Sequence, residues 1–244
     1  MEFSGEAVDG TYAVRQIGVI HSCFKEKFGI PRQAGMVSAA VAQLELFPPY
    51  NRQEMVRNLE QFSHIWVQFI FHQTLSSGWK ATVRPPLLGG KQRVGVFASR
   101  TPHRPNHLGL SAVRLEGIDC QPGHCLFHLS GVDFLDQTPV IDVKPYLPYS
   151  DAVPTAVAAA YAHGEQPAVS VRFSEQAKAF CDELQLRSGR DLRQLIIQLI
   201  RHDPRPASQR GRRSHFGMRL WDVNVRWRVA DEGVWVESCR GRGF

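Results

Sequence analysis

Short runs of alternating apolar and polar residues, separated by glycine, proline and asparagine, fill the first 150 residues. Alternation with a period of two is typical of a strand with one buried face. The run beginning at Tyr12 shows it, as does AQLELF, and five further runs are strand-like: HIWVQFIFHQ, RVGVFAS, SAVRLEGIDC, HCLFHLSGVDF and PVIDVKPYLP. So many short strands with turns between them predict an antiparallel barrel or sandwich.

One segment of this region departs from the strand pattern. Residues 50–62, YNRQEMVRNLEQF, have apolar residues at helical spacing and predict a helix. No G-x-G-x-x-G opens a helix after a strand, so a Rossmann-type cofactor domain is not indicated. We therefore predict that residues 12–150 form a mainly β domain, an antiparallel β-barrel with one or two helices.

The composition changes in the second half of the chain. Residues 151–169 are rich in alanine and proline and are interpreted as a linker. In residues 170–244, two segments with helical periodicity follow the candidate N-cap residues Ser174 and Asp191. The run RLWDVNVRWRVADEGVWVES predicts a β-hairpin that turns at residues 231–233. This pattern predicts a small α+β domain.

The N-terminal decapeptide MEFSGEAVDG has neither the basic nor the apolar region of a signal peptide. The most apolar run, HIWVQFIFH, is far shorter than the roughly 18 residues that a membrane helix needs. The five cysteines match no zinc-binding spacing, and no H-E-x-x-H occurs. We expect a soluble cytoplasmic protein with reduced cysteines, no metal and no membrane contact.

The charge distribution points to a polyanionic partner. The net charge is +6, and from Arg201 to Arg228 eight arginines face two acidic residues, Asp203 and Asp222. Guanidinium groups bind phosphate in a bidentate manner and stack on bases, so this bias favours nucleic acid. A solubilising surface is the alternative explanation.

Four polar stretches are candidates for a site: KEKFGIPRQAG, HQT at the end of a strand, RTPHRPNHLGLS and DQTPVIDVKPYLP. In the third, Pro102 and Pro105 stiffen the chain, and Gly109 permits a close approach of the backbone. Neither a G-x-S-x-G elbow nor a Walker sequence is present, which removes the main support for a serine hydrolase or a P-loop enzyme. The residues alone indicate a basic, β-rich protein that acts on RNA or a nucleotide.

Six segments carry a family likeness: PRQAG, FSHIWVQFIFHQT, VRPPLLGG, GVFASRTPHRPNHLG, DFLDQTPVIDVKPYLPYSD and DPRPA. Together they resemble the TrmO (YaeB/TsaA-like) tRNA methyltransferases over nearly the whole chain. The resemblance implies a small β-barrel with its own S-adenosylmethionine site, in a homodimer whose cofactor lies near the subunit interface. It also implies methylation of N6 of threonylcarbamoyladenosine, next to the anticodon of threonine tRNAs.

The chain departs from the family pattern at two places. His107 and Leu108 stand where the family usually has Pro-Ile, and Gln137 stands where it usually has glycine. We expect the first change to soften the loop and the second to alter the local turn, because glycine adopts positive φ more easily. Neither change removes a group that is expected to do chemistry.

The resemblance implies a cofactor site, and the chemistry of N6 methylation suggests candidate catalytic groups. The implied cofactor residues are Pro31, Arg32, Gln33, His72, Gln73, Arg100, Leu110, Asp136, Gln137, Thr138 and Pro139. A urea-type N–H must lose its proton, so we predict that Asp142, Lys144, Tyr146 and Asn106 assist the transfer, with Lys144 stabilising negative charge. A structural ion pair is the alternative for the first three. The predicted RNA contacts are Arg104, Arg201, Arg205, Arg210, Arg212 and Arg213, whereas Trp221 and Trp227 are expected in the core.

Two other functions stay open at this point. The first is a non-catalytic module that binds S-adenosylmethionine or RNA, and the second is a hydrolase that uses Asp136 and His72. Formation of S-adenosylhomocysteine in the presence of tRNA would distinguish the methyltransferase from the first, and cleavage without the sulfonium cofactor would identify the second.

Overall fold

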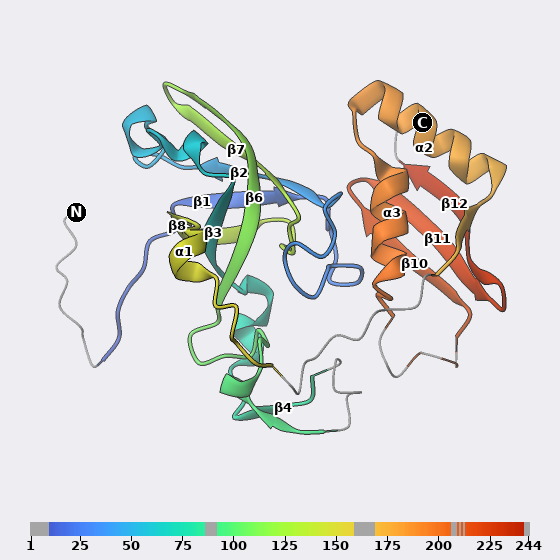
Figure 1. Ribbon diagram of the computed structural model, residues 1–244, viewed down its shortest axis with the longest axis horizontal. Helices are drawn as coiled ribbons and strands as arrows, with labels where there is room; N and C mark the ends of the chain where they lie inside the picture. The colour runs from blue at the N-terminus through green and yellow to red at the C-terminus, as the bar shows by residue number, and fades with distance from the viewer. Residues whose placement is uncertain are drawn as a thin grey trace.

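The computed structural model describes residues 10–85, 92–158, 169–205, 209, 211 and 213–241. A β-barrel and a C-terminal α+β unit lie side by side (Figure 1). This arrangement confirms the mainly β fold with a small α+β C-terminal region. Among the described residues, no helix has the length and apolar character needed to cross a bilayer.

Six strands form the barrel, and they close in the order β1-β2-β7-β6-β3-β8, with every neighbouring pair antiparallel. The strands are β1 (Gly18–Ser22), β2 (Val41–Leu46), β3 (His64–Ile70), β6 (Leu108–Gln121), β7 (His124–Ser130) and β8 (Thr138–Pro145). Alternation places every second side chain inside: Ile65, Val67 and Phe69 of β3 are buried, and their neighbours are partly exposed. Closure leaves no unpaired edge on this sheet.

The helix predicted for residues 50–62 is wrong. Two short 3-10 helices, η1 (Gln53–Met55) and η2 (Leu59–Gln61), occupy this segment. Asn58 between them has φ of 67°, a left-handed conformation that ends helical hydrogen bonding. The α-helix in this unit is the short α1 (Pro148–Asp151).

The strand predicted from RVGVFAS is also largely replaced by other structure. Only β5 (Val94–Gly95) is extended there, paired with β4 (Thr82–Val83), and the 3-10 helix η5 (Val96–Ala98) follows. The polar HQT triplet begins another 3-10 helix, η3 (His72–Ser77), directly after β3. The chain therefore leaves the barrel in a 3-10 turn at the end of β3.

The expectation of five reduced cysteines is wrong for one pair. Cys120 and Cys125 face each other across the β6–β7 hairpin and form a disulfide. A facing pair in a hairpin brings two Cβ atoms within reach of a disulfide, which the sequence spacing alone does not reveal. The three other cysteines, Cys23, Cys181 and Cys239, are free and buried.

The C-terminal unit is a four-stranded sheet with two helices on one face (Figure 1). Its strand order is β10 (His215–Leu220), β11 (Val223–Ala230), β12 (Gly233–Gly241) and β9 (Val171–Phe173). The predicted hairpin is confirmed, and β10 extends it by one strand. Both N-caps of α2 (Glu175–Ser188) and α3 (Leu192–Arg201) are confirmed: Ser174 Oγ accepts from the Ala177 amide and Asp191 Oδ1 from the Gln194 amide.

The two units share a continuous apolar core and several polar contacts. Gln198 of α3 accepts a hydrogen bond from the Ala39 amide at 2.9 Å. The Trp221 amide donates to the Cys23 carbonyl at 2.7 Å, and the fully buried Phe24 forms a β-bridge with Leu220. The segment after β1 therefore fixes the C-terminal sheet against the barrel.

Candidate functional site

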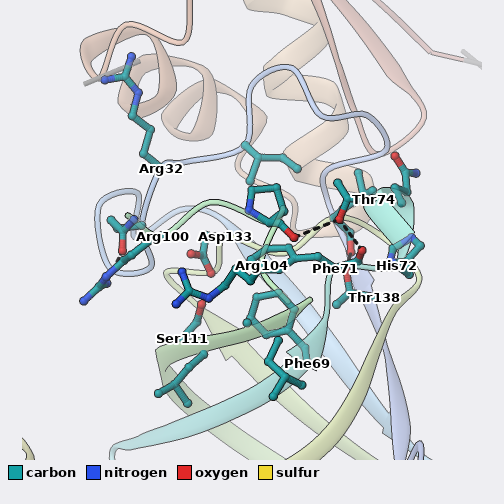
Figure 2. A pocket seen from close by; sticks show the side chains of 18 of the residues that line it. Arg32, Phe69, Phe71, His72, Thr74, Arg100, Arg104, Ser111, Asp133 and Thr138 are labelled. Carbon is teal, nitrogen blue, oxygen red and sulfur yellow. Dashed lines mark hydrogen bonds between the residues drawn. The ribbon is translucent and has the colours of Figure 1, made fainter. Parts of the chain in front are cut away.

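A cavity of about 660 Å³ opens at the end of the barrel where β3 ends and β6 begins (Figure 2). Three other parts of its wall come from residues 27–33, from the proline-containing loop between η5 and β6, and from the segment before β8. Four of the polar stretches singled out in the sequence thus meet at one place, although more than 100 residues separate the first from the last.

Most of the predicted cofactor residues lie on this wall. They are Pro31, Arg32, Gln33, His72, Gln73, Arg100, Leu110 and Thr138, and Arg104 of the predicted RNA set joins them. Asp136, Gln137 and Pro139 do not line the cavity, although they belong to the same turn as Thr138.

The guanidinium groups at the cavity are held by neighbouring loops. Arg100 Nη1 donates to Gln33 Oε1, which ties two distant loops together. Arg104 Nη1 donates to the Ser99 carbonyl at 2.7 Å, so its position on the wall is fixed by the backbone. Fixed guanidinium groups suit an anionic group such as a carboxylate.

Asp133 is a wall residue that is not among the predicted site residues, although it begins the DFLDQTP segment of the family likeness. Its Oδ1 atom is shielded from solvent and accepts no hydrogen bond within the described part of the chain. Burial raises the pKa of Asp133 to about 6, and hydrogen bonding from Ser111 and from the Ala34 backbone offsets only part of that effect. The sequence does contain a signal for this residue. Asp133 lies between Val132 and Phe134, and burial of an acidic side chain among apolar residues costs free energy, which is typical of a functional group.

Two groups on the described wall could accept a proton at neutral pH: Asp133 and His72. Burial lowers the pKa of His72 below its ordinary value of 6.5, so the imidazole is neutral at pH 7. A carboxylate and a neutral imidazole in a partly apolar cavity are suitable general bases.

The apolar part of the wall is built around Gly109. Three atoms of the Phe69 ring lie 2.2 to 2.6 Å from the place that a Cβ at position 109 would occupy, so only glycine fits. Phe71 packs edge-on against Phe69 with ring centroids 5.0 Å apart. The close backbone approach expected at Gly109 is confirmed, and the Phe69 and Phe71 rings form an aromatic floor next to it.

The softening of the loop expected at His107 stays a prediction, and the contacts of the His107 side chain oppose it. His107 is buried, and its Nδ1 atom lies 3.0 Å from the Pro102 carbonyl and 3.2 Å from Thr74 Oγ1 (Figure 2 shows Thr74 beside the cavity). Its φ is 50°, a conformation closed to proline. The histidine side chain therefore fixes the turn by hydrogen bonding where the usual proline would fix it by its ring.

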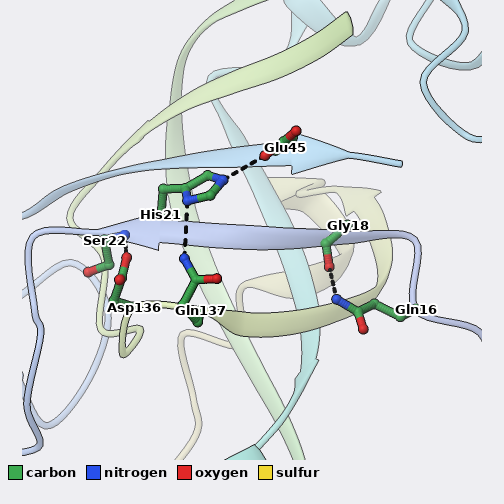
Figure 3. Close-up of polar contacts among 7 residues, drawn as sticks. All are labelled: Gln16, Gly18, His21, Ser22, Glu45, Asp136 and Gln137. Carbon is green, nitrogen blue, oxygen red and sulfur yellow. Dashed lines mark hydrogen bonds and ion pairs between the residues drawn. The ribbon is translucent and has the colours of Figure 1, made fainter. Parts of the chain in front are cut away.

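The turn before β8 is held by polar contacts with β1 and with the residues directly after it (Figure 3). Asp136 accepts from the Ser22 amide at 2.8 Å and pairs with Lys25 at 2.6 Å. Gln137 adopts φ of 64° despite its Cβ, and its amide nitrogen lies 3.3 Å from Nδ1 of His21. The turn thus keeps a positive-φ residue at the position where the family usually has glycine, and it presents Thr138 to the cavity.

None of the candidate catalytic residues in β8 or directly after it lines the cavity. Lys144 Nζ is 3.8 Å from Asp142 Oδ2, both side chains being well exposed. The ring of Tyr146 lies 5.5 Å from that of Trp66, which does line the cavity. Asn106 is exposed in the proline-containing loop and is not a wall residue.

The predicted RNA-binding arginines have different environments. Arg205 forms a two-pronged ion pair with Asp203, at 2.6 and 3.0 Å. Arg201 and Arg213 are exposed, whereas Arg210 and Arg212 lie outside the described residues. Trp227 is buried, as expected, and Trp221 is half-buried at the edge of the core. In the described ranges, no group of histidine, cysteine or acidic side chains could hold a metal ion.

Two family models match the chain: the tRNA-methyltransferase O N-terminal domain at residues 19–152 and the TrmO C-terminal domain at residues 166–242. A tRNA (adenine(37)-N6)-methyltransferase of Escherichia coli (strain K12) is 43% identical over 95% of this chain and 99% of its own length. A putative S-adenosylmethionine-dependent methyltransferase, RcsF, of Pseudomonas aeruginosa is 47% identical over 89% of this chain and 92% of its own. The crystal structure of TrmO from Pseudomonas aeruginosa superposes with a TM-score of 0.78 at 40% identity, covering 95% of this chain and 97% of that one.

These matches span both structural units and agree with the resemblance carried by the cavity loops. The chain therefore belongs to the tRNA-methyltransferase O family.

Proposed function

We propose that this protein transfers the methyl group of S-adenosylmethionine to N6 of threonylcarbamoyladenosine at position 37 of threonine tRNA. The observation that supports it most is the cavity itself, which gathers eight of the eleven implied cofactor residues. The chain also matches a tRNA (adenine(37)-N6)-methyltransferase along 99% of that enzyme's length. That the protein is a methyltransferase follows from its family. The proposal adds the identity of the modified nucleoside and of the tRNA.

The wall residues fit the methyl donor chemically. S-adenosylmethionine supplies an electrophilic methyl group on a sulfonium, and it carries a carboxylate, an ammonium group and an adenine ring. Arg100 suits the carboxylate, Asp133 adds negative charge near the cationic part, and the aromatic floor at Phe69 suits the ring. The unpaired Oδ1 of Asp133 indicates that a donor from a ligand is needed to complete the site.

Asp133 is our candidate for the proton acceptor. The N6–H of a urea-type group must be deprotonated as the methyl group is transferred, and a carboxylate with a pKa of about 6 is ionised at pH 7.5 yet basic enough to help. His72 is the other acceptor on the wall, and Asp142, Lys144 and Tyr146 remain predictions as supporting groups. In-line orientation by the fixed loops would supply much of the rate acceleration.

We also propose that the protein works as a homodimer. Three apolar side chains of the cavity rim are exposed: Phe97 is 79% exposed, Leu110 54% and Leu108 41%. Exposed apolar groups next to a site are typical of an interface, and a second copy would cover them. We propose further that Arg201, Arg213 and the arginines near them bind the tRNA. The proposed location of the reaction is the cytoplasm.

A methylation assay with radiolabelled S-adenosylmethionine tests the function. Two threonine tRNA samples are compared, one carrying threonylcarbamoyladenosine and one unmodified. We expect label only in the modified tRNA, and a loss of at least about 100-fold in kcat for Asp133→Asn, measured at saturating S-adenosylmethionine. His72→Gln, assayed in parallel, tests the other proton acceptor, and Lys144→Ala tests the stabilisation of negative charge.

Label in neither tRNA, with S-adenosylmethionine still bound in calorimetry, would overturn the enzyme proposal and support a non-catalytic binding module. Equal label in both tRNA samples would overturn the requirement for the threonylcarbamoyl group. An unchanged kcat in Asp133→Asn would remove Asp133 from the chemistry.

A further inference from the structure

The C-terminal sheet has one face without helices, and this face carries arginines that the sequence patterns do not single out. Met218, Val225 and Val236 are buried on the helix side. Because side chains alternate along a strand, Arg219 of β10, Arg226 of β11 and Arg240 of β12 emerge on the other side, and all three are exposed. These three, with the small residues between them, are called the open sheet face below.

Strand register sets the layout of the open sheet face. Asn224 lies opposite both Arg219 and Arg240. In the adjacent row, Arg226 is flanked by Gly217 and Ser238. Since glycine and serine are short, the sheet is hollowed there. A depression of about 400 Å³ is lined by Glu26, Gly217, Met218, Asn224, Val225, Arg226, Ser238 and Arg240.

The arginines of this face lack anionic partners. Within the described part of the chain, Arg219, Arg226 and Arg240 form no side-chain ion pair or hydrogen bond. Other arginines of the same sheet do have acidic partners: Arg228 pairs with Glu237 at 3.3 Å and Arg172 with Glu232 at 3.0 Å.

One acid, Glu26, stands at the rim of the depression, and its Oε1 accepts the Arg219 amide at 2.9 Å. The open sheet face therefore keeps an excess of positive charge.

A second depression, of about 380 Å³, continues the positive surface toward the barrel. It is lined by Lys25, Arg190, Arg219, Trp221 and Asp222. Arg190 lies 5.3 Å above the Trp221 ring and 3.5 Å from Asp222, while the Lys25 ammonium is 2.6 Å from Asp136. Arg219 lines this second depression, and its chain neighbour Met218 lines the first. Positively charged side chains therefore extend from Arg240 to Lys25, which pairs with Asp136 of the turn before β8.

We propose that the open sheet face binds the phosphate backbone of the tRNA substrate through Arg219, Arg226 and Arg240. Three uncommitted guanidinium groups match phosphate oxygens, and the floor of Asn224 and Ser238 offers further hydrogen-bond donors. The inference rests on the proposed tRNA methylation and adds a contact surface separate from Arg201 to Arg213.

A charge-removal experiment tests this surface. The variant Arg219→Ala/Arg226→Ala/Arg240→Ala is compared with Lys178→Ala/Arg187→Ala/Arg193→Ala, which removes the same charge from α2 and α3 on the opposite side. Equilibrium binding to threonine tRNA is measured by fluorescence anisotropy between about 0.05 and 0.3 M salt. We expect the first variant to lose about 10- to 100-fold in affinity and about 2 units in the slope of log K against log salt, and the control to change little.

A charge-insertion experiment gives a second, independent readout. A Cβ at position 217 would meet only the Val225 carbonyl, at 3.6 Å, which is an ordinary contact, so substitutions there fold without strain. Gly217→Glu places a negative charge in the depression, whereas Gly217→Gln adds the same bulk without charge. We expect the glutamate variant to bind tRNA at least about 5-fold more weakly than the glutamine variant.

The outcomes separate this inference from the proposed function. Wild-type methylation and binding, with affinity unchanged in both the triple variant and Gly217→Glu, would overturn the inference alone. Equal losses in the triple variant and its helix-side control would also overturn it, because net charge alone would then explain the effect. Absence of tRNA binding or methylation by the wild-type protein would refute the proposed function itself. Unchanged S-adenosylmethionine affinity in every variant is required for a contact that is confined to RNA.

Discussion

The ring of Phe69 fills the space that a side chain at position 109 would need, with its Cζ atom 2.2 Å from the ideal Cβ position. Phe69 belongs to β3 and Gly109 faces it across the ladder on β6. The aromatic floor of the cavity therefore depends on the absence of a Cβ on the facing strand.

We expect Gly109→Ala to displace the Phe69 ring. Overpacking of this kind costs roughly 1–3 kcal/mol of unfolding free energy, and the shifted ring would narrow the cavity and weaken S-adenosylmethionine binding. Urea unfolding and titration calorimetry measure the two effects. Gly95→Ala is the matched control, because no atom lies within 4 Å of its ideal Cβ. Wild-type stability and affinity in Gly109→Ala would show that the floor is not rigid.

The two departures from the family pattern make a second prediction. Gln137 has φ of 64° and His107 has φ of 50°. A left-handed conformation costs a residue with a Cβ about 1 kcal/mol relative to glycine. We expect Gln137→Gly to be more stable than Gln137→Ala by about that amount, since both lack the amide near His21 and differ only in backbone freedom. Equal unfolding midpoints for the two variants would contradict the assigned backbone conformation.

At His107, proline and asparagine are expected to differ sharply. Proline holds φ near −65° and removes the amide that donates to the Arg104 carbonyl at 3.1 Å, so His107→Pro should cost about 3 kcal/mol or more. Asparagine tolerates the left-handed region, so His107→Asn should lose only the contacts of the imidazole. Urea unfolding of both variants checks the order, and a stable His107→Pro would show that the loop can adopt the family's usual turn.

Much of the fold could be predicted from the sequence because local rules decide it. The alternation in β3 and the caps Ser174 and Asp191 follow from side-chain direction and from unpaired amides at helix ends. The same rules fail for residues 50–62. The apolar residues there are spaced as in a helix, but the left-handed conformation of Asn58 interrupts the segment. The Cys120–Cys125 disulfide likewise depends on strand register, which spacing does not give.

The candidate site was predictable in its loops and less so in its chemistry. Asp142 and Lys144 are two residues apart, so they share one face of β8, beside Gln68 and Trp66 of β3. Neither lines the cavity, although both lie in the most distinctive motif of the chain. Asp133 reaches the cavity from the segment before β8, and only tertiary structure shows that its carboxylate is buried without a partner for Oδ1.

The exposed rim predicts how the protein assembles. If a second copy covers Phe97, then Phe97→Asp should place a charge in the interface and shift the protein toward monomers. Leu186→Asp is the control, because Leu186 is 88% exposed on α2, away from the cavity. Sedimentation velocity at several concentrations measures both. A monomeric wild-type protein, or a dimer that Phe97→Asp leaves intact, would contradict the proposed interface.

Asp133 makes the stability of the protein depend on pH in a defined direction. Its folded-state pKa of about 6 is above its ordinary value of 3.8, so the folded state binds the proton more tightly than the unfolded state. The stabilising contribution is complete below pH 3.8 and is lost as the pH rises through 6. At pH 8 the ionised, buried carboxylate costs about 3 kcal/mol, because each pKa unit corresponds to about 1.4 kcal/mol.

Asp133→Asn removes this cost, because the amide is neutral at every pH. We expect the variant to be more stable than the wild-type protein by about 3 kcal/mol at pH 8, with the difference shrinking between pH 6 and pH 4. Urea unfolding at four pH values measures it, and Asp119→Asn, at an exposed position, is the control. Gained stability together with lost methylation would mean that the protein keeps a costly buried carboxylate for its chemistry. If the difference in unfolding free energy between the variant and the wild-type protein does not change with pH, then folding does not oppose the ionisation of Asp133.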